Sequence, residues 1–128
     1  MNKTHKYEYQ AEVVKVVDGD TIDVLIRWDV GFHITCETYQ RLRLARINAP
    51  EVRGSEREKG LKAKEWLEEA LASARREILI RTSKDDSFGR WVAEVVCTYG
   101  DPSRSEKDIT ININDNLVKA GHAEYKEY

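Results

Sequence analysis

The sequence predicts a small five-stranded β-barrel of the OB type, with one long helix after the third strand and a short C-terminal helix. Three observations support this class. Five segments carry β-branched residues at strand density. One long stretch has helical apolar spacing, and a second, shorter one lies near the C-terminus. Because 128 residues is the usual size of one domain, we expect residues 1–128 to form a single domain.

The first two strands are expected at 9–17 and 21–28, where Val and Ile are frequent. Asp18-Gly19-Asp20 between them is a turn signal, so the pair should form a hairpin. We expect a second reversal at 29–31 and then a polar extended stretch over 32–39. This stretch leads into the third strand at 41–47.

The third strand must end or bulge early if Arg43 and Asn48 serve one site. Side chains alternate between the two faces of a strand, so strict alternation would put these two residues on opposite faces. Pro50 follows closely and favours an early end.

The long helix is expected to begin at a capping box formed by Ser55 and Glu58. Its apolar residues recur at spacings of three and four: Leu61, Ala63, Trp66, Leu67, Ala70, Leu71 and Ala74. Strands at 77–82 and 91–98 should follow, joined by a polar turn, and 99–107 should be a loop. Residues 109–113 alternate, Asn114 can cap the short helix, and Gly121 should close it.

Composition excludes several functional classes. The 21 basic and 23 acidic residues give a net charge of −2, which argues against a protein that coats nucleic acid by bulk electrostatics. No apolar run is long enough to cross a bilayer. The N-terminus lacks a signal-peptide core, so we expect a cytoplasmic protein, although a secreted form trimmed of its leader would look the same. Cys36 and Cys97 lack metal-site spacing and are expected to be reduced.

Oxygen-bearing side chains follow two separate segments. Asp18, Asp20 and Asp23 cluster at the first turn, whereas Asn48 and Glu51 follow the third strand. Carboxylate, amide and backbone oxygens in loose geometry suit calcium better than magnesium. Ordinary turn propensity is the alternative explanation for the three aspartates.

Arg43 in the third strand and Arg90 at the turn before the fifth could together hold a phosphate. Guanidinium groups bind phosphate with a planar fork of donors and stabilise charge that builds up on phosphorus. The alternative is an edge strand whose arginines are simply solvated.

The ordered combination of motifs closely resembles the staphylococcal nuclease-like family, also called thermonucleases. The matching motifs are Asp18-Gly19-Asp20-Thr21, Arg43 with Asn48-Ala49-Pro50-Glu51, Phe88-Gly89-Arg90, and Leu117-Val118 with Gly121-His122-Ala123. The resemblance covers roughly residues 13–125. It implies an OB-type barrel and a calcium-dependent phosphodiesterase that cuts DNA and RNA with little sequence preference and leaves 3′-phosphate ends.

The resemblance also implies roles for individual residues. Asp20 corresponds to a metal-ligand aspartate, and Asn48 falls where the family usually has the second ligand aspartate. Ala49 would give its backbone carbonyl to the metal. Glu51 corresponds to the glutamate that positions or deprotonates the attacking water. The two arginines that contact the scissile phosphate correspond to Arg43 and Arg90.

Asn48 is the chief departure from the family, because an amide keeps the oxygen but removes one negative charge. We expect weaker calcium binding. For substrate binding we single out Arg41, Phe88 and Tyr125, although Tyr125 could instead pack against the last helix. The expected partner is single-stranded DNA or RNA, with no membrane, and we expect a monomer. The alternative function is an inactive OB-fold module that binds single strands or a protein partner.

Overall fold

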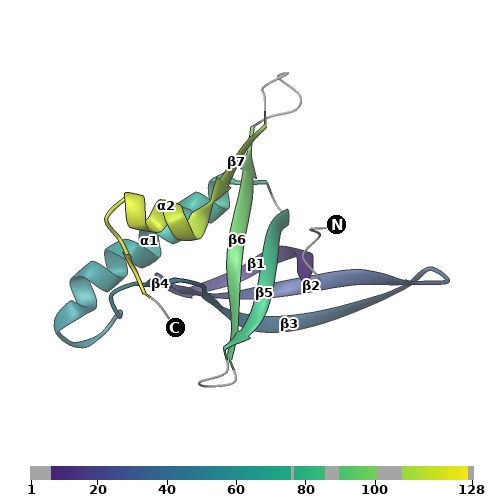
Figure 1. Ribbon diagram of the computed structural model, residues 1–128, viewed down its shortest axis with the longest axis horizontal. Helices are drawn as coiled ribbons and strands as arrows, with labels where there is room; N and C mark the ends of the chain where they lie inside the picture. The colour runs from purple at the N-terminus through teal and green to yellow at the C-terminus, as the bar shows by residue number, and fades with distance from the viewer. Residues whose placement is uncertain (1–6, 76, 86–89, 101–107, 127–128) are drawn as a thin grey trace.

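The computed structural model describes residues 7–75, 77–85, 90–100 and 108–126 (Figure 1). These residues form, in order, β1 (Glu8–Asp18), β2 (Thr21–Gly31), β3 (Ile34–Leu44), β4 (Ile47–Asn48), the 3₁₀ turn η1 (Gly54–Glu56), α1 (Arg57–Ser73), β5 (Glu77–Asp85), β6 (Arg90–Tyr99), β7 (Ile109–Asn112), α2 (Ile113–Lys119) and β8 (Glu124–Tyr125).

The main sheet has the order β3-β2-β1-β5-β6-β7, and a further pairing of β3 with β6 closes it. That pairing is parallel and short, joining Arg43 to Val92 and Leu44 to Ala93. All other neighbours in this sheet are antiparallel. β1, β2, β3, β5 and β6 therefore enclose a five-stranded mixed barrel, as predicted, and β7 extends β6 beyond it.

The core lies between the inner faces of these strands and the helices. β2 and β3 contribute Ile22, Val24, Leu42 and Leu44, which are fully or almost fully buried. α1 buries Ala63, Leu67 and Leu71, as its apolar spacing predicted, and also Gly60, whereas Leu61 is exposed. Each fully buried Leu or Ile side chain stabilises the fold by about 1.5–3 kcal/mol.

The expected capping box does not cap α1. Ser55 lies in the 3₁₀ turn η1, the N-cap is Glu56, and no side chain caps the helix by a hydrogen bond. Glu56 instead accepts a hydrogen bond from the backbone N–H of Glu51, at 3.3 Å. The prediction was wrong because the entry turn tightens to hold the preceding segment.

The expected cap of α2 was also misplaced. Asn112 is the N-cap and accepts from the N–H of Asp115, at 3.1 Å. Asn114 is fully buried, donates to the carbonyls of Ala45 and Ala93, and accepts from the N–H of Val95. It therefore links the ends of β3 and β6 where the barrel closes. Gly121 does end the helix, with φ +83°, as predicted.

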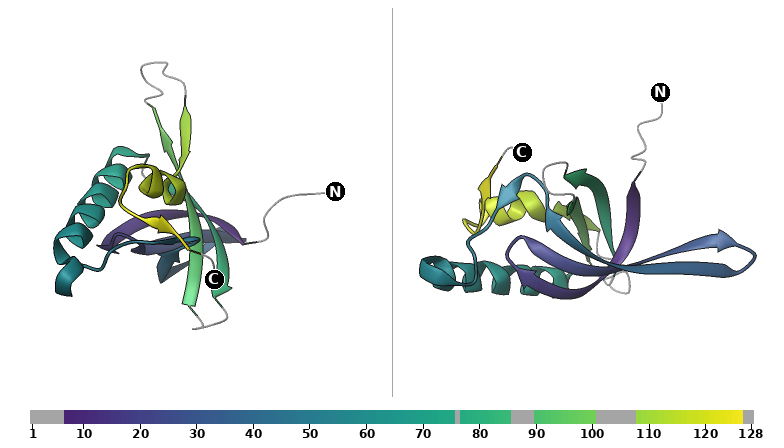
Figure 2. Two further views of the ribbon diagram at one scale, coloured as in Figure 1. Left: turned by 60° about the vertical axis from the view of Figure 1, so that its left-hand side comes forward. Right: turned by 90° about the horizontal axis from the view of Figure 1, so that it is seen from below.

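The reversal expected at 29–31 lies further along the chain. β2 continues to Gly31 and pairs with residues that were expected to be merely extended, such as Cys36 opposite Trp28. The turn falls at Gly31, Phe32 and His33, which all have positive φ. The result is a long β2–β3 hairpin that projects past the barrel, away from the two helices (Figures 1 and 2).

The third strand ends at Leu44, before Asn48, as the alternation argument required. Arg46 adopts φ +65°, and the chain then forms the short strand β4, which pairs with β8. Within the described residues, no helix is long and apolar enough to span a membrane.

Candidate active site

Asp20 lies at the turn between β1 and β2 and is only 8% exposed. Its Oδ2 accepts from the backbone N–H of Ala49 at 3.0 Å, and its Oδ1 accepts from the Thr21 hydroxyl at 3.1 Å. Gly19 makes this approach possible, since a Cβ there would lie 2.7 Å from the Ala63 Cβ and 2.9 Å from the Ala49 Cβ. The turn, α1 and the 47–49 segment are thus packed around one carboxylate.

Arg43 joins the two segments that were predicted to share a site. Its Nη2 donates to Asp20 Oδ2 at 3.3 Å and to Asn48 Oδ1 at 2.8 Å. The side chains of Arg43 and Asp20 are 13% and 12% exposed, so this ion pair is largely shielded from solvent. The structure therefore brings together four of the predicted site residues: Asp20, Arg43, Asn48 and Ala49.

The pKa of Asp20 is raised from 3.8 to about 6, chiefly by burial and next by a hydrogen bond with the Asp18 side chain. The Ala49 N–H and the charge of Arg43 oppose this shift without cancelling it. Burial and a neighbouring carboxylate both disfavour the ionised form of a carboxyl group. A cation bound at this position would favour it.

The oxygen donors are of the type that a hard cation prefers, but their total charge is low. Asp20 Oδ2 and Asn48 Oδ1 both lie within 3.3 Å of one guanidinium nitrogen, so their oxygens converge on a small volume. Ala49, the residue expected to give a carbonyl, is tied to Asp20 by its N–H. Only one of these three residues carries a charge, which is few for calcium. Consistent with that, the described residues contain no group of three or more His, Cys, Asp or Glu side chains placed to hold a metal.

Glu51 lies two residues after Ala49, on an exposed segment between β4 and η1. Glu56 fixes its backbone N–H. Its carbonyl oxygen packs so closely on α1 that a Cβ at Gly60 would lie 2.1 Å from it.

Glu56 and Gly60 are therefore positioning residues that the sequence reasoning missed. A glycine inside an otherwise good helix was the available signal, since it costs stability unless a close contact requires it.

Arg90 begins β6, and its backbone pairs with Asp85. It stands two residues before Val92, the β6 partner of Arg43, so the register places it at the same junction of the barrel. Its side chain and all of Phe88 lie outside the described residues, and their roles stay predictions.

Arg41 and Tyr125 have other partners in the structure. Arg41 makes two hydrogen bonds to Asp23, at 2.8 and 3.1 Å. Tyr125 donates its hydroxyl to Asp115 of α2 at 2.9 Å, and the Arg46 guanidinium lies 5.8 Å from its ring centroid. Tyr125 thus packs beside the last helix, which was the alternative for it, and substrate binding by either residue stays a prediction.

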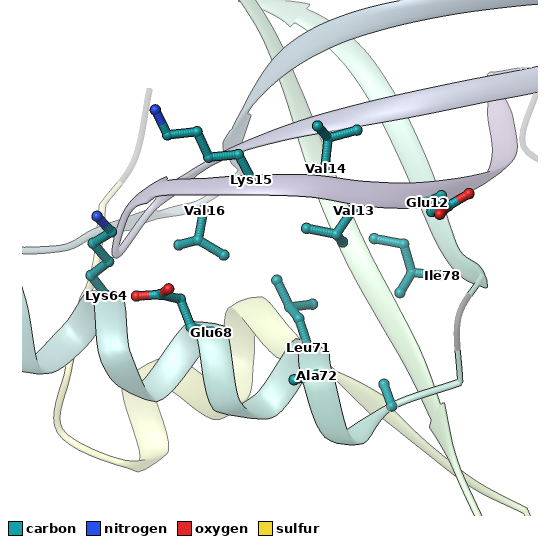
Figure 3. A pocket seen from close by; sticks show the side chains of 11 residues that line it. Glu12, Val13, Val14, Lys15, Val16, Lys64, Glu68, Leu71, Ala72 and Ile78 are labelled. Carbon is teal, nitrogen blue, oxygen red and sulfur yellow. The ribbon is translucent and has the colours of Figure 1, made fainter.

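Two cavities help to delimit the site. A polar one of about 260 Å³ adjoins Asn48 and is lined by Pro50, Glu56, Lys59, His122 and others. A larger one of about 550 Å³ lies between β1 and α1, where Val13, Val16 and Leu71 meet Lys64 and Glu68 (Figure 3). None of the predicted site residues lines the larger cavity.

Comparison with known proteins now decides the family. The family model described as staphylococcal nuclease homologue matches residues 41–128, more than half of the chain. The chain belongs to this family. Its match covers the end of β3 from residue 41, the 47–51 segment, α1 and β6, and therefore most of the residues in the site.

Two relatives extend the likeness to the N-terminal hairpin. A micrococcal nuclease from Shigella flexneri is 33% identical over 116 residues, which are 91% of this chain and 58% of the relative. Protein ParB from Escherichia coli is 32% identical over 118 residues, or 91% of this chain and 56% of the relative. The chain thus spans little more than half the length of the relatives that it matches.

Proposed function

We propose that this protein is a calcium-dependent nuclease that hydrolyses DNA or RNA without sequence preference and leaves 3′-phosphate ends. The convergence of Asp20 and Asn48 on the Arg43 guanidinium, with the Ala49 N–H bonded to Asp20, is the observation that carries the proposal. A module that only binds strands has no need for a buried carboxylate at this position, because the Asp20 carboxylate competes with phosphate for the Arg43 guanidinium. Membership of the nuclease family supports the same function.

Asp20, Asn48 and the Ala49 carbonyl would hold the cation. Bound calcium would act as a Lewis acid on a phosphate oxygen. The protein's own residues position and neutralise the substrate. Arg43, joined by Arg90, would bind the phosphate and stabilise the charge that develops as phosphorus becomes five-coordinate.

Glu51 would orient the attacking water and accept its proton. The water oxygen forms a bond to phosphorus, the bond from phosphorus to the 5′ oxygen breaks, and the 5′ oxygen takes up a proton from solvent water. The phosphate then remains on the 3′ side. Because Glu51 is exposed and its backbone is fixed by Glu56 and Gly60, its carboxylate can face a strand arriving from solvent.

The test is cleavage of single-stranded DNA and RNA by purified protein across a calcium titration, with magnesium and a chelator as controls. We expect calcium-dependent cleavage that falls by about 10² or more in Glu51→Gln. Circular dichroism should show an unchanged fold, since Glu51 is exposed. Folded protein that binds strands but does not cut them at millimolar calcium would point instead to the inactive binding module.

A further inference from the structure

The free part of the β2–β3 hairpin carries an unusual share of exposed apolar side chains. β1 pairs with β2 only as far as Ile26, so residues 27–38 form a two-stranded ribbon beyond the barrel (Figure 1). Trp28 is 41% exposed, Val30 50%, Ile34 55%, and Phe32 at the tip 92%. A contiguous exposed apolar surface of this kind usually marks an interaction site.

Trp28, Cys36 and Ile34 share one face, whereas Val30 lies at an irregularity in the β2–β3 register and Phe32 lies in the turn. Trp28 pairs with Cys36, and alternation places both on the face of the buried residues Ile26 and Val24. Ile34, two residues before Cys36, lies on the same face. The barrel's core face therefore continues along the ribbon after the barrel has ended, and Trp28 and Ile34 are exposed on it.

The opposite face of the ribbon is polar. It carries the Arg27–Glu37 ion pair, with a 3.0 Å contact, and also Asp29 and Thr35. The apolar face lacks charged residues from Val24 to Trp28 and from Ile34 to Leu42. It offers no cation for a nucleic-acid phosphate or an anionic lipid, so it suits an apolar protein surface.

A small apolar cavity lies at the base of the same face. It is lined by Tyr9, Ile26, Gln40, Leu42, Thr82 and Trp91, and its volume is about 160 Å³. A protein cavity of about 150 Å³ accommodates one benzene ring. The cavity could therefore hold one aromatic side chain from outside.

We propose that the ribbon is a dimerisation surface and that its partner is a second copy of this chain. Two ribbons pack their apolar faces antiparallel about a two-fold axis, and Phe32 of each tip enters the cavity at the base of the other. The tip carries an exposed aromatic ring, and the base carries a cavity of the size of one ring. The face is therefore self-complementary, as a two-fold interface requires. This proposal is independent of the catalytic one.

The dimensions agree with this arrangement. Six residues separate Ile26 from Phe32, so the tip lies about 20 Å from the base at a rise of about 3.3 Å per residue. The two-fold axis then falls midway along the ribbon, near the Trp28–Cys36 pair. An interface of one ribbon face is small, so we expect a dissociation constant in the range of about 1–100 μM. A dimer would replace the monomer expected from sequence.

Sedimentation velocity over about 1–300 μM protein tests the proposal. We expect a concentration-dependent dimer in the wild type and a monomer in Phe32→Asp. Tyr39→Asp is the matched control, because Tyr39 is 67% exposed on the opposite face of the same hairpin. Circular dichroism should show both variants folded, since neither side chain is in the core.

A short bis-maleimide cross-linker gives a second measurement. Cys97 is fully buried, whereas Cys36 is partly exposed near the proposed axis, so a covalent dimer should form and should be lost in Cys36→Ser and Phe32→Asp. A protein that stays monomeric throughout the range would overturn the proposal. So would a dimer that survives Phe32→Asp, or one that Tyr39→Asp disrupts equally.

Discussion

Arg43 holds the candidate site together before any substrate binds. Its guanidinium contacts an oxygen of Asp20 and an oxygen of Asn48, and so neutralises a carboxylate that burial would otherwise protonate. Binding a phosphate requires the same donors to turn toward the substrate. The planar fork matters for this exchange because it has five donors in fixed directions.

Arg43→Lys should therefore retain the charge but lose most of the activity. An ammonium is a point charge that cannot serve two oxygen partners in the fork geometry. We expect kcat to fall by about 10²-fold or more, with a smaller change in KM. Steady-state kinetics at saturating calcium would show this, and a kcat within about threefold of wild type would contradict the role.

Glu94 provides a pH-dependent contribution to stability away from the site. Burial raises its pKa, but hydrogen bonds from Arg46 and Asn112 outweigh burial, so the net pKa is lowered from 4.5. A carboxyl whose folded pKa is lowered stabilises the fold above its unfolded pKa, and this stabilisation is lost as pH falls through the folded value.

Arg46→Gln should thus destabilise the protein at neutral pH and much less at a pH below the folded-state pKa of Glu94, where this carboxyl is protonated in both states. Arg46 contacts Glu94 at 2.7 Å, and the variant also loses the Arg46 contact with Asp115 at 3.0 Å. Urea unfolding of wild type and variant at the two pH values measures this difference in the free energy of unfolding. An equal loss at both pH values would show that the ion pairs are not its origin.

At the scale of elements, the sequence predicted α1, most of its buried stripe and the hairpin of the first two strands, because hydrophobic spacing determines which face an element buries. It predicted neither helix start correctly. Ser55 and Asn114 are both good capping residues, yet Ser55 lies in a 3₁₀ turn and Asn114 links β3 to β6. Their tertiary partners come from distant parts of the chain, and local propensity does not contain them.

The contact between α1 and the segment carrying Glu51 depends on Gly60. A Cβ at this position would lie 2.1 Å from the Glu51 carbonyl oxygen and 2.4 Å from its carbonyl carbon, so Gly60→Ala must displace the segment. We expect a loss of activity of at least about tenfold in protein that remains folded.

Lys62→Ala, at an exposed position of the same helix, is the control and should change neither activity nor fold. The comparison needs only cleavage rates and thermal melts of the three proteins. Unchanged activity in Gly60→Ala would mean that the position of Glu51 does not matter for the reaction.

At the scale of the whole molecule, barrel closure brings together residues that are far apart in sequence. The β1–β2 turn supplies Asp20, and β3 supplies Arg43 and leads to Asn48 and Ala49. The order of motifs in the sequence identified these residues. The structure explains how Arg43 and Asn48 meet: β3 ends early, and the backbone of Arg46 adopts a left-handed conformation. The sequence did not predict the long ribbon, because residues 32–39 lack the apolar density of a buried strand.

The calcium concentration for half-maximal cleavage of single-stranded DNA, compared between wild type and Asn48→Asp, tests the central claim most directly. The account predicts cleavage by both proteins, with half-maximal calcium lower by about tenfold or more in the variant, because a second carboxylate adds charge at the site. An unchanged calcium requirement, or no cleavage by either protein at millimolar calcium, would contradict the assignment of a calcium-dependent nuclease centred on Asp20, Asn48 and Arg43.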